Sequence, residues 1–203
     1  MAAKDPFKFS KTDFQLTRLV AGLAALATLV IAVVKPVAAW VVGDPLVAEV
    51  ERLAETPADG AKPGVTLTHG SAVTAEFADA GASLWLASII PGALFAGILI
   101  VVLWLLWRLL GDVERGEPFT LANVWRMRGI AWAMVGGAFL LFTVDGLANA
   151  YLTQHAVEGA STIFTNTTTG SDLLLPGAGF LIGALAEAFK RGVVLEGDVE
   201  GLV

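Results

Sequence analysis

The chain predicts an all-α membrane protein: one domain (1–203) of four transmembrane helices with a small extracytoplasmic α/β cap. Three observations predict this fold class. The hydrophobic fraction is 56% and only 16% of residues are charged. Four apolar runs cover about 19–42, 84–110, 130–150 and 173–189, and a helix needs about 20 such residues to cross about 30 Å of hydrocarbon. Finally, the basic residues gather between alternate runs.

The basic residues predict the orientation of the spans. Positive charge near span ends marks the cytoplasmic side, so we predict both termini inside (N-in/C-in). The cytoplasmic segments are then a loop at 111–128 and a tail at 190–203, and the outer loops are 43–82 and 151–171. Ten of the thirteen Lys and Arg residues support this assignment: Lys4, Lys8, Lys11, Arg18, Arg108, Arg115, Arg126, Arg128, Lys190 and Arg191.

The first apolar run follows a basic leader, which is also typical of a signal peptide. The run is longer than the about 7–15 apolar residues of a signal peptide, so we expect a membrane span. Pro36 should kink this helix, and the Lys35 amine can reach the outer surface.

The first outer loop, 43–82, predicts the secondary structure of the cap. Asp44 and Pro45 are typical of a helix start, so we expect a short helix ending near Glu55. Residues 65–68 and 72–77 alternate as strands of a hairpin do. Residues 161–169 of the second outer loop are rich in β-branched types and are a candidate third strand. We expect this cap to be a lid, with a ligand-binding surface as the alternative.

The two halves of the chain resemble each other. A Phe-Ser/Thr pair, with Asp or Asn three residues after the hydroxyl, precedes both the first and the third run at Phe9 and Phe119. Such a pattern caps a helix, so the fold is either two parallel helical hairpin repeats or two helices with similar starts. Pro91-Gly92 and Pro176-Gly177 are a second similarity between the halves. Each pair lies near the outer end of its span, the second and the fourth, and could loosen the helix there.

Asp145 is the clearest candidate intramembrane site. A carboxyl group within an apolar span is costly unless it is paired or wet. Asn149 lies one helical turn further on, and Lys35 is a candidate partner from the first span. The alternative is a structural carboxyl group near the outer interface.

Residues 116–123 read Gly-Glu-Pro-Phe-Thr-Leu-Ala-Asn and are followed by Arg126-Met127-Arg128. Residues 189–195 read Phe-Lys-Arg-Gly-Val-Val-Leu, before an acidic stretch. These motifs, and the four-span layout, resemble DUF2975, a bacterial membrane family of unknown function. The resemblance implies a non-catalytic anchor or sensor for a small helix-turn-helix regulator in the cytoplasm.

The cytoplasmic segments hold the candidate partner-binding residues. The tail could dock in a groove or on a sheet edge of a partner, or fold back on the basic loop 111–128. The candidates are Phe119, Arg126, Arg128, Lys190, Arg191, Leu195, Glu196 and Asp198.

Composition and motifs narrow the function. No cysteine is present, no phosphate loop or nucleophile motif occurs, and the net charge of −6 disfavours direct nucleic-acid binding. His69 and His155 have no metal-ligand spacing. We therefore expect that the protein is not an enzyme and that it binds no metal or cofactor. We expect it to be surrounded by the lipid bilayer of the cytoplasmic membrane. The alternatives are a small transporter or channel using Asp145, an accessory subunit of a larger complex, and a homo-oligomer.

Overall fold

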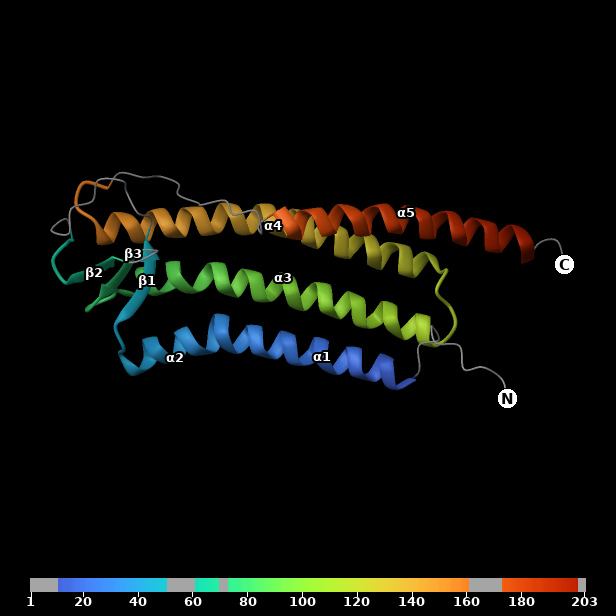
Figure 1. Ribbon diagram of the computed structural model, residues 1–203, viewed down its shortest axis with the longest axis horizontal. Helices are drawn as coiled ribbons and strands as arrows, with labels where there is room; N and C mark the ends of the chain where they lie inside the picture. The colour runs from blue at the N-terminus through green and yellow to red at the C-terminus, as the bar shows by residue number, and fades with distance from the viewer. Residues whose placement is uncertain (1–10, 51–60, 70–72, 161–172, 201–203) are drawn as a thin grey trace. The chain divides into compact units, whose positions relative to one another are not determined.

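The computed structural model describes residues 11–50, 61–69, 73–160 and 173–200 (Figure 1). It is mostly helical, with one small sheet. Its elements are α1 (Lys11–Leu29), η1 (Val30–Val34), α2 (Lys35–Val42), β1 (Leu46–Val50), β2 (Val65–His69), β3 (Val73–Phe77), α3 (Ala82–Glu114), α4 (Leu121–Ala156) and α5 (Leu174–Glu200).

Three helical stretches are long and apolar enough to cross a membrane: Thr12–Val42, Ala82–Glu114 and Leu121–Ala156. None of the most apolar window of the first stretch is buried inside the protein. Apolar helix surfaces of this length left uncovered by protein require a hydrocarbon solvent. The chain is therefore a membrane protein. In α5, charged residues from Glu187 onward shorten the apolar stretch.

The first span changes its winding ahead of a proline. The π-helix η1 lies between α1 and α2, and the Lys35 N–H donates to the Val30 carbonyl five residues back. Pro36 has no N–H to give the Ala32 carbonyl, which is its partner in an α-helix. The sequence predicted a kink from Pro36, and the structure places a local widening of the helix directly before it.

The contacts divide the chain into two units, and α1, α3 and α4 run continuously from one into the other. The basic unit comprises 1–27, 98–135 and 174–203, and the strand-bearing unit comprises 28–97 and 136–173.

In the strand-bearing unit, three antiparallel strands lie in the order β1-β3-β2. Phe77 of β3 stands opposite both Leu46 of β1 and Val65 of β2. The predicted β2–β3 hairpin is confirmed, and the candidate strand at 161–169 lies outside the described residues. The sheet packs with the first turns of α3 and the last turns of α4, and this core contains Leu46, Val50, Val73, Ala75, Phe77, Leu84, Trp85, Ile89, Leu152, Ala156 and Val157.

The predicted short helix from Asp44 to Glu55 is wrong over its first half, because Leu46–Val50 is strand β1. Leu46 and Val50 are buried, while Val47 and Glu49 between them are exposed. This alternation has the period of a strand. Pairing with β3 therefore outweighs the helix-start signal of Asp44 and Pro45.

The Pro-Gly pairs do not break their helices. Pro91 lies inside the continuous helix α3, and Pro176 lies in the first turn of α5, where a missing N–H costs little. Next to Pro91, Gly92 allows close contact, because a Cβ atom there would lie 3.1 Å from the Ala32 carbonyl oxygen.

In the basic unit, α5 packs against the first half of α4. A Cβ atom on Gly179 would lie 2.8 Å from Val135 Cγ2 and 3.1 Å from the Ala131 carbonyl oxygen. Gly179 therefore sets how closely the two backbones approach.

Candidate functional site at the basic end

The connection between α3 and α4 begins with a glycine-terminated helix end. Gly116 has φ 84°, a value that residues with a Cβ atom rarely adopt. Its N–H donates to the Val113 carbonyl at 3.1 Å, and the Glu117 N–H donates to the Asp112 carbonyl at 3.0 Å. This pair of bonds is a Schellman motif, which satisfies the last carbonyls of α3.

Thr120 caps the start of α4, as its position in the sequence predicted. Its Oγ1 accepts the Asn123 N–H at 3.2 Å. The Asn123 side chain is only 1% exposed and turns back over the loop. Its Nδ2 donates to the carbonyls of Glu117 at 3.3 Å and Pro118 at 3.2 Å. The buried Asn123 amide thus ties two carbonyls of the loop to the first turn of α4.

Asp112 is the acidic centre of the connection. It is buried, and its carboxylate is bound by Arg115 and Arg126. The same Arg126 Nη1 donates to Asn123 Oδ1 at 2.6 Å. A buried carboxylate with two guanidinium partners and a buried amide form one polar network, which we call the Asp112 network: Asp112, Arg115, Asn123 and Arg126. The sequence motifs predicted Arg126 as a site residue but not Asp112.

Phe119 joins this connection to α5. Its ring centroid lies 5.3 Å from that of Phe189. A Cβ atom on Gly192 would lie 2.9 Å from the Phe119 ring, so the glycine leaves room for it. The two motifs that carried the family resemblance therefore meet in the structure. The residues after Phe189 continue helix α5 through Glu200.

The other predicted partner-binding residues fall into three groups: some form ion pairs, some are exposed, and some have side chains outside the described residues. Arg128 is engaged, since its Nη2 lies 3.0 Å from Glu187 Oε2 and its guanidinium lies over Trp125. Lys190 lies 3.8 Å from the same carboxylate. Arg191 and Leu195 are exposed, and the structure describes no ion pair for Arg191. The side chains of Glu196 and Asp198 lie outside the described residues.

A further ion pair joins α1 to the end of α3. Arg18 Nη2 lies 2.9 Å from Glu114 Oε2, and the Arg18 guanidinium lies 5.7 Å from the centre of the Trp107 ring. The basic end is therefore held by charged contacts from α1, α3, α4 and α5.

The candidate intramembrane residues lie in the strand-bearing unit. Asp145 Oδ2 accepts from Asn149 Nδ2 at 3.1 Å, and both side chains are half-buried. The Lys35 side chain is exposed, and its pairing with Asp145 stays a prediction. Within the described ranges no three His, Cys, Asp or Glu side chains gather as a metal site.

Membrane-length apolar helices, a small sheet and a charged junction at one end define a helical membrane protein of the polytopic class. Residues 50–201 match the family described as "Protein of unknown function (DUF2975)". This match covers more than half of the chain, which therefore belongs to the DUF2975 family, as its motifs predicted. No curated protein matches the chain. No solved structure matches it either.

Proposed function

We propose that this protein is a non-catalytic component of the cytoplasmic membrane that anchors, or senses for, a small cytoplasmic helix-turn-helix transcription regulator. The observation that carries the proposal is the part of α5 after Phe189, residues 190–200, which we call the α5 extension. The helix continues past Phe189 to Glu200 and exposes Val194 and Leu195. Neighbouring apolar side chains on the exposed face of a helix suit a groove on a partner.

The proposal requires that this end of α5 faces the cytoplasm. In the described basic unit lie Arg18, Arg108, Arg115, Arg126, Arg128, Lys190 and Arg191. By the positive-inside tendency this unit is cytoplasmic, with both termini inside.

The proposed topology has four crossings. Helix α4 has 36 residues, which at 1.5 Å per residue is about 54 Å of helix and enough to cross about 30 Å of hydrocarbon. The chain leaves α4 after Ala156 and returns to pack Gly192 on Phe119, just before the start of α4. We propose that this return is the fourth crossing and that α5 belongs to it.

A fixed platform supports docking by α5. The Asp112 network and the Phe119–Phe189 contact hold the loop and the base of the α5 extension before any partner arrives. A preorganised surface loses less conformational entropy on binding. We propose that Arg191, Val194 and Leu195 contact the regulator, and that Asp112, Asn123 and Arg126 position them.

Affinity capture of the tagged full-length protein in mild detergent, read by mass spectrometry, tests the proposal. We expect the wild-type protein to retain a small helix-turn-helix protein. Leu195→Glu should reduce its recovery at least tenfold, because a charge replaces an apolar anchor. The matched control is Val47→Glu, which places the same charge on an exposed valine of β1.

Two results would contradict the proposal. If the wild-type protein retains no helix-turn-helix protein, the anchor function is wrong. If Leu195→Glu and Val47→Glu retain the regulator equally well, the α5 extension is not its docking site.

A transporter or channel is the second candidate function. It is favoured by the half-buried Asp145–Asn149 pair within an apolar helix. Cation-dependent flux in proteoliposomes that disappears in Asp145→Asn would favour this function over the anchor.

A further inference from the structure

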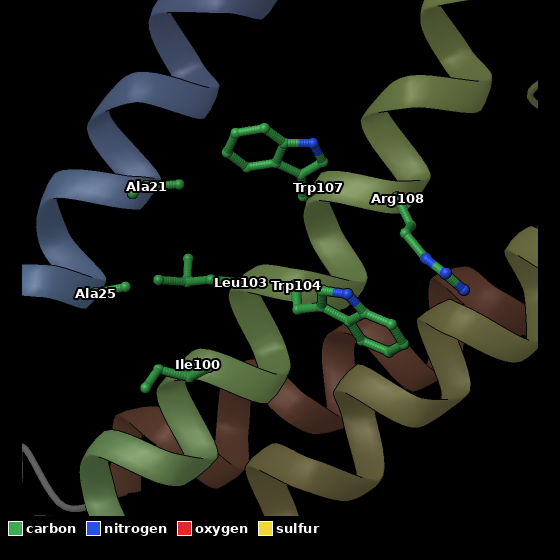
Figure 2. A pocket seen from close by; sticks show the side chains of 8 residues that line it. Ala21, Ala25, Ile100, Leu103, Trp104, Trp107 and Arg108 are labelled. Carbon is green, nitrogen blue, oxygen red and sulfur yellow. The ribbon is translucent and has the colours of Figure 1, made fainter. Parts of the chain in front are cut away.

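A groove of about 510 Å³ lies on the basic unit, over α1 and α3 (Figure 2). Small pockets that bind ligands commonly have about 300–1,000 Å³. From α1 the groove is lined by Ala21, Gly22 and Ala25, and from α3 by a stripe that begins at Ile100 and ends at Arg108. Its volume is that of a site for a small or slender ligand.

The walls of the groove are apolar. Ala25 points toward Leu103 of α3, Ala21 points toward the same helix one turn away, and the Trp107 ring lies between the two helices (Figure 2). A Cβ atom on Gly22 would find no other atom within 4 Å, so the α1 side of the groove is open. Open apolar walls along two membrane helices suit a hydrocarbon chain, because such a chain has no polar atom to satisfy.

One end of the groove carries an unmatched positive charge. Arg108 forms no ion pair with any residue that the structure describes, and its guanidinium lies 4.5 Å from the centre of the Trp104 ring. Figure 2 shows the guanidinium beside that indole. The neighbouring Arg18 is matched by Glu114. The groove therefore has an apolar length and a net positive end.

Two tryptophans indicate where the charged end of the groove lies relative to the membrane surface. Trp104 and Trp107 both line the groove, and both are exposed. Tryptophan is enriched at the level of lipid headgroups. A guanidinium at that level is placed to bind a phosphate oxygen through two N–H donors.

We propose that this groove binds an anionic phospholipid, with one acyl chain between α1 and α3 and the headgroup phosphate on Arg108. The proposal goes beyond the function of the α5 extension. It uses a different face of the basic unit, and it can be tested on the purified protein without a regulator.

Native mass spectrometry of the purified full-length protein, with phosphatidylglycerol or phosphatidylcholine of the same chain length, tests the site. We expect the wild-type protein to bind phosphatidylglycerol more tightly. Arg108→Gln should weaken phosphatidylglycerol binding about tenfold or more, as loss of a hydrogen bond to a charged group does. It should weaken phosphatidylcholine binding less, because the choline cation already offsets the charge of that lipid's phosphate, so the preference for phosphatidylglycerol should shrink. Ala25→Phe should weaken binding of both lipids, because the ring fills the chain groove.

Arg191→Gln is the matched control, since it removes one exposed arginine of the same unit that lies outside the groove. It should bind both lipids like the wild type, and circular dichroism should show equal helix content in all variants. Equal affinity of the wild-type protein for both lipids would overturn the proposal, as would unchanged phosphatidylglycerol binding in Arg108→Gln. A dimer that Ala25→Phe dissociates, without lipid selectivity, would instead assign the groove to a second copy of the chain.

Discussion

The Asn123 side chain binds three groups of the α3–α4 connection: the carbonyls of Glu117 and Pro118, and the guanidinium of Arg126. Each of these groups would need another partner if the amide were absent. Because Asn123 is 1% exposed, water cannot readily replace it. The position therefore tests how much of the basic end depends on one buried amide.

Asn123→Ala should destabilise the protein by about 2–3 kcal/mol, because three hydrogen bonds made by a buried amide are lost together. Thr120→Ala, which removes one helix cap, should cost about 1 kcal/mol. Titration with sodium dodecyl sulfate in mixed micelles, followed by circular dichroism, measures both. Equal losses in the two variants would show that the Asn123 amide adds nothing beyond an ordinary cap.

Single residues also show what the sequence could reveal about the site. The sequence predicted the cap at Thr120 from local spacing, and it placed Asn149 one helical turn after Asp145, where the structure shows a hydrogen bond. Asp112 was missed because its partner Arg126 lies across the loop, and only the folded turn brings the two together. Its signal was an acidic residue at the end of an apolar run, surrounded by arginines.

At the scale of elements, the contact between α4 and α5 depends on a glycine. A Cβ atom on Gly179 would lie 3.1 Å from a backbone atom of α4, and a backbone cannot rotate away as a side chain can. Gly177, two residues earlier in the same helix, has nothing within 4 Å of its own Cβ position. The two glycines form a matched pair.

Gly179→Ala should destabilise the protein by about 1–3 kcal/mol, because the helices must separate. Gly177→Ala should be neutral or should stabilise by up to about 1 kcal/mol, because alanine favours helix. Thermal unfolding in mild detergent, followed by circular dichroism, measures the difference. If Gly179→Ala is as stable as Gly177→Ala, α5 does not pack closely on α4.

The elements differ in how far the sequence predicted them. The hairpin of β2 and β3 follows from alternation and was correct. Strand β1 has the same alternation, but Asp44-Pro45 before it is also a helix start, and only pairing with β3 decides between the two. Pro36 accounts for the π-helix η1, but η1 lies before Pro36 in the chain. A proline predicts that a helix is distorted and does not specify where or how.

At the scale of the whole molecule, hydropathy predicted where the apolar helices lie but underestimated their lengths. The third run was predicted at 130–150, whereas α4 covers Leu121–Ala156. The additional turns mix polar and apolar residues: Asn123 and Arg126 belong to the Asp112 network, and Leu152 and Ala156 belong to the sheet core. Helix that continues beyond hydrocarbon has no hydropathy signal, so its length could not be predicted from the apolar run.

The proposed topology can be tested directly because the chain has no cysteine. Single-cysteine variants Glu117→Cys and Arg191→Cys should react with an impermeant maleimide only after the cells are permeabilised. Thr66→Cys, on an exposed position of β2, should react in intact cells. Labelling of Arg191→Cys and Glu117→Cys from opposite sides would contradict the fourth crossing.

The α3–α4 connection also has a consequence for biosynthesis. The partners of Asp112 and Asn123 all lie between Asp112 and Arg126, so no later part of the chain is needed to complete the network. Chains are made from the N-terminus and begin to fold as they emerge. The α3–α4 hairpin can therefore close while the ribosome is still translating α5, which then joins a finished surface through Phe119.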